Sequence, residues 1–218
     1  MQYSLPLQAG CFYHIYNRGN GCDLFFEQKN YHYFLTLYGR YICPIAETYA
    51  YCLLKNHFHF LIRIRETSGV TETSEVLKTS EVLASPMVSK PPIQHFANFF
   101  NSYAKAINKA YHRSGSLFEN RFGRVLVDND AYLVHLVSYI HRNPQRHGFV
   151  SDFRTYPFSS YRAILEQRQS QVEIKKVLEW FGSLTAFEQY HRQFDEDCIT
   201  HLLGSDERDL NLRGLKDL

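Results

Sequence analysis

The order in which two hydrophobic periodicities alternate along the chain is the feature that most restricts its fold. Short β-branched and aromatic runs with alternating side chains predict strands, and longer segments with apolar residues three or four positions apart predict amphipathic helices. Strands are expected at Cys11–Asn17, Ile45–Leu54, Phe58–Arg65 and Arg124–Val127. Helices are expected at Lys29–Arg40, at Phe96–Tyr111 and from Asn129 or Asp130 to near Asn143, where Pro144 disfavours helical geometry.

The resulting order is strand–helix–strand–strand–helix–strand–helix, which predicts an α+β fold class with a ferredoxin-like antiparallel sheet covered by helices. The chain has 218 residues, which suits one domain with a small addition. We expect residues 1–165 to form the main domain and residues 166–218 to form a helical C-terminal appendage. Further helical periodicity occurs at Ser159–Gln167, Val172–Phe181 and Thr185–Phe194.

A segment of unusual composition separates the third expected strand from the second helix. Residues 67–92 contain the pentapeptide TSEVL twice and end in two consecutive prolines. Such low-complexity composition predicts a flexible insertion without a core of its own.

Cysteine usage and hydropathy exclude several classes of protein. The five cysteines are scattered and never form a CxxC pair, which argues against a disulfide scaffold or a zinc ribbon. The apolar stretches are much shorter than the roughly 20 residues of a membrane-spanning helix. The N-terminal segment lacks the basic and apolar regions of a signal peptide. We therefore expect a cytoplasmic protein with no membrane partner.

Charge is distributed unevenly along the chain. Residues 1–165 contain 17 Lys and Arg against 11 Asp and Glu, whereas residues 166–218 contain 7 against 11. The basic residues of the first part are interleaved with Tyr and Phe. Cationic grooves lined by aromatic rings suit single-stranded nucleic acid, because the phosphates pair with Lys and Arg side chains and the nucleobases stack on the aromatic rings. A mildly basic solvated surface is the other interpretation of the same charges.

The sharpest local pattern is NHFHFLI at Asn56–Ile62. In a strand, side chains alternate between faces, so His57 and His59 point one way and Phe58 and Phe60 the other. Two neutral imidazoles side by side form half of a metal site. The pattern alone is not specific, because structural histidines produce it as well.

A second group of polar residues lies on the third expected helix. His135, Tyr139 and Asn143 follow each other at intervals of four, which predicts a shared face. The apolar residues Leu133, Leu136, Val137 and Ile140 would form the packing face. Tyr139 would then lie in a polar stripe, one turn before an amide that could bind a metal; a tyrosine at the edge of the core is the alternative.

Taken together, five segments resemble the HUH single-tyrosine transposases of the insertion-sequence type, and most of all their REP-associated branch. The segments are YHIYNRGN (Tyr13–Asn20), YCLLKNHFHFLIRI (Tyr51–Ile64), GSLFENRFGR (Gly115–Arg124), DAYLVHLVSYIHRNPQRHGFV (Asp130–Val150) and YPFSSYRAIL (Tyr156–Leu165). The chain departs from the family in two places: Lys55 replaces the proline common before the HUH segment, and the insertion at 67–92 is longer than expected.

The resemblance implies an HUH nuclease fold and a specific chemistry. His57 and His59 match the HUH metal ligands, Tyr139 matches the catalytic tyrosine, and Asn143 matches the third ligand. Family members cleave single-stranded DNA beside a hairpin, form a 5′-phosphotyrosine and a free 3′-OH, and then rejoin strands. The implied cofactor is Mg²⁺ or Mn²⁺, with no organic cofactor, and the implied partner is single-stranded DNA with a hairpin.

DNA contacts are expected from basic residues in the first 165 positions, and a solvated surface role is the alternative for each of them. The candidates are Arg18, Lys105, Lys109, Arg113, Arg121, Arg124 and Arg142. Insertion-sequence relatives work as dimers, whereas REP-associated relatives with a C-terminal tail tend to be monomers. The tail of this chain slightly favours a monomer over a homodimer.

Three other functions remain open from the sequence. A non-catalytic nucleic-acid-binding protein on the same fold would use its tyrosines to stack bases. A metal-dependent hydrolase would use the histidines to activate water and would form no covalent adduct. A relaxase would share the chemistry, but relaxases are usually longer than this chain.

Overall fold

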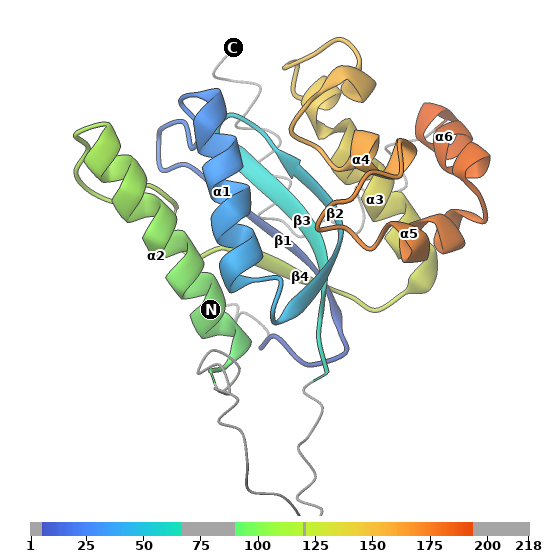
Figure 1. Ribbon diagram of the computed structural model, residues 1–218, viewed down its shortest axis with the longest axis horizontal. Helices are drawn as coiled ribbons and strands as arrows, with labels where there is room; N and C mark the ends of the chain where they lie inside the picture. The colour runs from blue at the N-terminus through green and yellow to red at the C-terminus, as the bar shows by residue number, and fades with distance from the viewer. Residues whose placement is uncertain (1–5, 67–89, 120, 194–218) are drawn as a thin grey trace, which may run out of the picture.

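One antiparallel sheet organises the molecule, and helices cover both of its faces (Figure 1). The computed structural model describes residues 6–66, 90–119 and 121–193. The strands are β1 (Phe12–Arg18), β2 (Ala46–Leu53), β3 (His57–Ile64) and β4 (Gly123–Val127). The helices are α1 (Gln28–Tyr41), α2 (Pro92–Ala110), α3 (Asp130–Arg146), α4 (Tyr161–Leu165), α5 (Ile174–Phe181) and α6 (Leu184–Gln193), with a short 3₁₀ helix at Phe153–Thr155.

The strands lie in the order β2-β3-β1-β4, and each neighbouring pair is antiparallel. This order and the sequence of elements confirm the predicted α+β fold with a ferredoxin-like sheet. The observed strands begin and end within two residues of the predicted ones. The alternation of side chains therefore located the strands correctly, because the two faces of the sheet pack against different hydrophobic layers.

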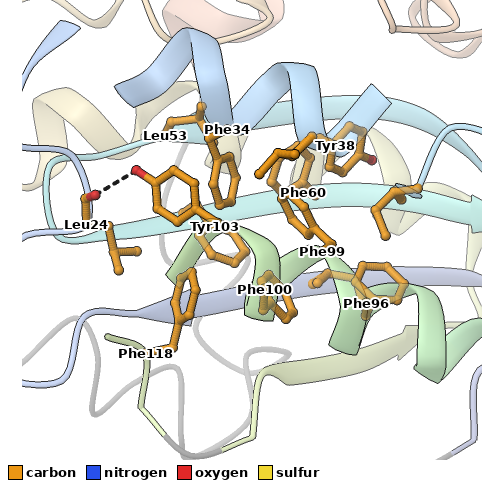
Figure 2. Packing of buried hydrophobic residues seen from close by; sticks show 14 of the residues in the cluster. Leu24, Phe34, Tyr38, Leu53, Phe60, Phe96, Phe99, Phe100, Tyr103 and Phe118 are labelled. Atoms are coloured by element: carbon orange, nitrogen blue, oxygen red, sulfur yellow. Dashed lines mark hydrogen bonds between the residues drawn. The ribbon is translucent and has the colours of Figure 1, made fainter. Parts of the chain in front are cut away.

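The first layer lies between the sheet and helices α1 and α2 (Figure 2). Phe58 and Phe60 of β3 project into it and contact Phe34 of α1, which in turn packs against Phe99 of α2. Tyr103 buries its ring here as well, and its hydroxyl donates a hydrogen bond to the carbonyl of Leu24 (2.7 Å). The aromatic richness of the sequence thus accounts for one complete core layer.

The second layer lies between the other face of the sheet and helices α3 to α6. Leu133, Leu136, Val137 and Ile140 of α3 are buried there, as their spacing predicted. The chain after α4 contributes to the same layer through side chains that are also buried. These are Val172, Val177 and Phe187.

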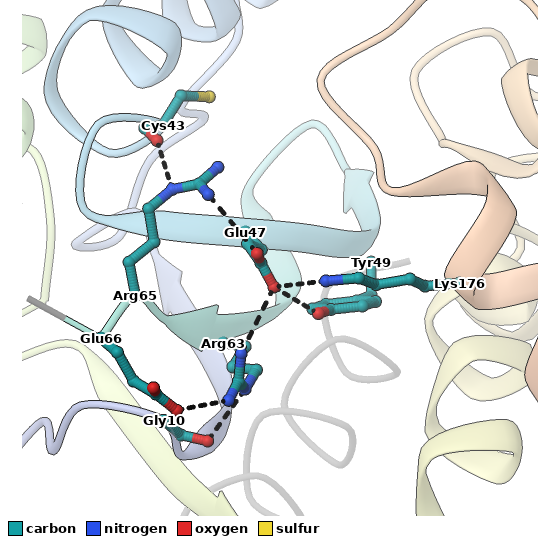
Figure 3. Close-up of polar contacts among 8 residues, drawn as sticks. All are labelled: Gly10, Cys43, Glu47, Tyr49, Arg63, Arg65, Glu66 and Lys176. Atoms are coloured by element: carbon teal, nitrogen blue, oxygen red, sulfur yellow. Dashed lines mark hydrogen bonds and ion pairs between the residues drawn. The ribbon is translucent and has the colours of Figure 1, made fainter. Parts of the chain in front are cut away.

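An ion-pair cluster around Glu47 fixes α5 to the sheet (Figure 3). The Glu47 carboxylate on β2 accepts a hydrogen bond from Tyr49 (2.6 Å) and pairs with Lys176 of α5 (3.1 Å). Arg63 and Arg65 of β3 lie 3.8 and 3.4 Å from the same carboxylate. Burial works to raise the pKa of Glu47, but the bonds from Tyr49 and Lys176 and the nearby positive charges outweigh it and hold that pKa below its usual value.

Helix α3 is longer than predicted. It continues through Pro144 to Arg146, and the N–H of His147 still bonds the carbonyl of Asn143 (2.9 Å). Proline in the last turn removes only one helical hydrogen bond, so the helix tolerates it near its end. The chain leaves the helix at Gly148, whose φ of 72° favours glycine. The extra turn places Arg146 and His147 beside the candidate site.

The insertion predicted at 67–92 falls largely on residues 67–89, which lie outside the described residues. Pro92 at its end opens α2, a position where proline lacks only an N–H that would have had no helical partner. Among the described residues, no helix combines the length and apolar character needed to cross a membrane.

Candidate active site

Strand β3 presents His57 and His59 on the face that α3 covers. Their neighbours Phe58 and Phe60 belong to the opposite core layer, which confirms the predicted alternation. The two imidazole rings are perpendicular, with centroids 5.2 Å apart. Both histidines are buried, so the site lies between the sheet and the helix and not on an open surface.

Helix α3 brings Tyr139 to these histidines, and Asn143 follows one turn later on the same helix. The ring centroid of Tyr139 lies 6.0 Å from that of His59, and Tyr139 is only 1% exposed. Tyr139 is therefore buried in the second core layer, where its ring faces those of His14 and His59. The predicted face shared by all three polar residues is wrong for His135, which contacts Tyr190 of α6. Eight residues at 3.6 per turn leave His135 and Asn143 about 80° apart around the helix.

The donor atoms at this point fit a divalent metal ion. The side-chain amide nitrogen of Asn143 donates to the carbonyl of Tyr139 (2.9 Å), while its Oδ1 is buried and has no hydrogen-bond partner among the described residues. A buried carbonyl oxygen without a partner is costly, and a metal ion would satisfy it. The Asn56 Oδ1 lies 2.7 Å from His57 Nδ1 and can only accept, so His57 carries its proton on Nδ1 and keeps a lone pair on Nε2.

Electrostatics favour the neutral form of His57. Burial lowers the pKa of His57 well below 6.5, and the charges of His59, His147 and Arg18 lower it further. A metal ligand has to be unprotonated, so this environment leaves His57 ready to bind at neutral pH. The described residues contain no group of three or more His, Cys, Asp or Glu arranged to hold a metal ion. A site here consequently depends on the amide oxygen of Asn143.

Four further residues, none of them among the predicted site residues, surround this site. His14 and Tyr16 on β1 have their ring centroids 5.3 and 6.2 Å from that of His59. His147 packs edge-on against His57 at 4.8 Å, and the guanidinium carbon of Arg146 lies 5.2 Å from the centre of the Tyr139 ring. The alternation of β1 contained a signal, because residues 14, 16 and 18 share one strand face.

The predicted DNA-binding residues do not form one surface. Arg18 lies beside His57, its partner in the β1–β3 register, and its Nη1 is buried without a hydrogen-bond partner among the described residues. Lys105 and Lys109 are exposed on α2, which covers the opposite face of the sheet. Arg121 is exposed just before β4.

The three remaining candidates stack on aromatic rings. Arg113 lies over Phe26 and Arg124 over Phe122, both next to the first core layer. Arg142 lies over Phe153 and donates a hydrogen bond to the carbonyl of His191 in α6 (2.7 Å). Arg142 therefore joins α3 to the C-terminal helices.

Comparison with known proteins agrees with these motifs. No protein-family model matches the chain. A protein of Haemophilus influenzae with the provisional name REP-associated tyrosine transposase is 28% identical over 115 residues, which are 53% of this chain and 58% of that protein. The chain thus matches little more than half of the length of this relative.

A solved structure shows the same fold. The structure of a REP-associated tyrosine transposase bound to a REP hairpin has a TM-score of 0.54 and 16% sequence identity, and the match covers 78% of this chain and 89% of that one. In sequence and in fold, the chain therefore resembles the REP-associated tyrosine transposases, as its motifs predicted.

Proposed function

We propose that this protein is a metal-dependent transposase-like endonuclease that cleaves and rejoins single-stranded DNA beside a hairpin. The observation that carries the proposal is the meeting of the Tyr139 ring from α3 with His59 from β3, 80 residues away in the chain, with the buried and unsatisfied Oδ1 of Asn143 one helical turn further along. The two relatives support hairpin DNA as the partner, because one of them is bound to a REP hairpin. All four side chains belong to one chain, which supports a monomer.

In the proposed reaction, the Tyr139 oxygen attacks the scissile phosphorus in line with the bond to the 3′-oxygen. The Tyr139 O–P bond forms, the P–O3′ bond breaks, and the 3′-oxygen leaves with a proton as a free hydroxyl. Rejoining is the reverse attack by a 3′-OH and needs no ATP, because the phosphotyrosine conserves the energy of the broken diester. Arg18, next to His57, would pair with a phosphate oxygen.

A tyrosine hydroxyl has an ordinary pKa near ~10 and is a weak nucleophile without help. Held by His57, His59 and Asn143, Mg²⁺ or Mn²⁺ would supply Lewis-acid stabilisation of the charge on the phosphate. Because Tyr139 is 1% exposed, the groups over it have to move when DNA binds. The long side chain of Arg146, which covers the Tyr139 ring, is one such group.

The burial of Tyr139 also favours a second candidate, a non-catalytic hairpin-binding protein on the same fold. The two functions differ in one product, a covalent protein–DNA adduct. Labelled single-stranded DNA with a hairpin, incubated with the protein and Mn²⁺ and run on a denaturing gel, distinguishes them. We expect an adduct with the wild type and none with Tyr139→Phe, His57→Ala or His59→Ala.

Tyr132→Phe on the same helix is the matched control and should form the adduct normally. Tyr139→Phe should still bind the hairpin, since it loses only the hydroxyl. An adduct that maps to another tyrosine would refute the role of Tyr139, and binding without any adduct would favour the non-catalytic candidate.

A further inference from the structure

His14 lies behind the candidate metal site and was not among the predicted site residues, although the segment YHIYNRGN contains it. It is 1% exposed, on β1, and its Nε2 is 3.1 Å from Nδ1 of His59 on β3. The two rings are stacked, with planes 25° apart. His59 pairs with Tyr16 in the register, so His14 is its diagonal neighbour across the two strands.

The hydrogen bond between these histidines restricts how His59 can bind a metal. Because its Nδ1 contacts His14, a metal ion bound to His59 would be ligated by Nε2. A neutral imidazole has one lone pair and one N–H. If Nε2 holds the metal, Nδ1 must carry the proton, and His14 Nε2 must accept it.

We propose that His14 is a positioning residue that fixes the tautomer and ring orientation of His59, so that His59 offers Nε2 to the metal ion. This inference rests on the proposed function and adds to its site a residue that contacts the metal ligand His59. Asn56 does the same for His57, so each of the two ligands has its own partner at Nδ1. Removing the hydrogen-bond partner of a metal-ligating histidine typically weakens metal binding about 10- to 100-fold.

Two substitutions separate the acceptor role from packing. His14→Gln keeps an atom that can accept the proton of His59, whereas His14→Phe keeps a ring but has no acceptor. His95→Phe is the matched control, because His95 is also buried but lies on α2 on the opposite face and contacts the carbonyl of Tyr41 (3.2 Å). Mn²⁺ affinity is measured by electron paramagnetic resonance, and the His59 tautomer by ¹⁵N chemical shifts of the metal-free protein.

We expect the wild type to show His59 protonated on Nδ1, and His14→Phe to lose this preference and bind Mn²⁺ about 10- to 100-fold more weakly. His14→Gln should restore both, and His95→Phe should bind as the wild type does. If His14→Phe does not fold, His59 protonated on Nε2 in the wild type would by itself overturn the inference. Equal Mn²⁺ affinity in wild type and a folded His14→Phe would also overturn it, and leave the proposed function standing. A wild type that binds no Mn²⁺ would overturn both.

Discussion

Tyr16 and Gly123 face each other across β1 and β4, and the ring of Tyr16 lies directly over the glycine backbone. A Cβ atom built on Gly123 would be 2.1 Å from Cζ of Tyr16, far inside van der Waals contact. The same ring packs against His14 and His59. Gly123 is therefore required for the arrangement of the imidazoles and not for an unusual backbone angle.

We expect Gly123→Ala to displace the Tyr16 ring, since both partners are held in adjacent strands. Overpacking of this kind costs about 1–3 kcal/mol of stability, which urea unfolding would measure. Mn²⁺ affinity should fall with it, because the ring supports His14 and His59. The double variant Gly123→Ala with Tyr16→Leu should recover part of the stability. A Gly123→Ala protein as stable as the wild type would contradict the packing described here.

Arg18 and Arg142 offer a matched pair of arginines with different surroundings. Arg18, next to His57, has its Nη1 buried without a hydrogen-bond partner among the described residues and lies 3.9 Å from the Glu119 carboxylate, whereas Nη1 of Arg142 donates to the His191 carbonyl and its guanidinium lies over Phe153. We expect Arg18→Ala to weaken binding of a single-stranded hairpin and to reduce its salt-dependence slope by about 0.7, the value for one phosphate contact. Arg142→Ala should leave the slope unchanged and lower stability. Fluorescence anisotropy over a salt series measures both, and an altered slope for Arg142→Ala would contradict the assignment.

At the scale of elements, a chain of buried hydrogen bonds joins the C-terminal helices to α3. His191 of α6 contacts the carbonyl of Phe187 through Nδ1 (2.8 Å) and His141 of α3 through Nε2 (2.9 Å). His141 in turn contacts Ser160 at the start of α4 (2.7 Å). A carbonyl can only accept, so His191 donates from Nδ1, His141 donates to His191, and Ser160 donates to His141. All donors are satisfied with both histidines neutral.

The neutral state of His191 predicts a pH dependence of stability. Burial lowers the pKa of His191 to about 3, whereas in the unfolded chain it titrates near its usual 6.5. The facing groups are His141 and Arg142 on α3, and the charge of Arg142 lowers the pKa as well. Below pH 6.5, His191 binds a proton in the unfolded chain but not in the folded protein. The free energy of unfolding therefore keeps its full value above that pH and decreases as the pH falls below it.

Between pH 7 and pH 5, His191 should therefore contribute a loss of about 2 kcal/mol to the free energy of unfolding. His191→Phe should reduce the pH dependence in this window by that amount, even though the variant is less stable overall. His32→Phe, which changes an exposed histidine of α1, is the control. Parallel stability curves for wild type and His191→Phe would contradict the prediction.

The sequence predicted where strands and helices lie better than it predicted which residues come together between them. Periodicity located α1 and α2 because each helix buries one well-defined face, and it located the strands because their alternate side chains enter different core layers. It misplaced the end of α3, because the rule for residues before proline is local while the packing of the last turn is not. It could not find His14 or His147, since their partners lie 45 and 90 residues away and only the strand register and the α3–sheet contact bring them together.

At the scale of the whole molecule, the sheet separates two cores of different composition. One core is predominantly aromatic and packs α1 and α2, and the other packs α3 to α6 and contains the candidate site. The helix with Tyr139 is thus held between the sheet on one side and the C-terminal helices on the other. Polar contacts of Arg142 and His141 join α3 to α6, and the Glu47–Lys176 pair joins the sheet to α5.

This arrangement predicts how the chain responds to truncation after Leu165, the domain boundary expected from the sequence. Loss of residues 166–218 removes Val172, Val177 and Phe187 from the second core, and each buried side chain of this size contributes about 1.5–3 kcal/mol. The sum, about 5–9 kcal/mol, is comparable with the entire stability of a typical domain, about 5–15 kcal/mol. We therefore expect residues 1–165 alone to lose cooperative unfolding in urea and the dispersed amide spectrum of a folded protein. The single variant Val177→Ala should unfold cooperatively at a lower midpoint, and a truncated chain with the midpoint of the full protein would show that the C-terminal helices are dispensable for the fold.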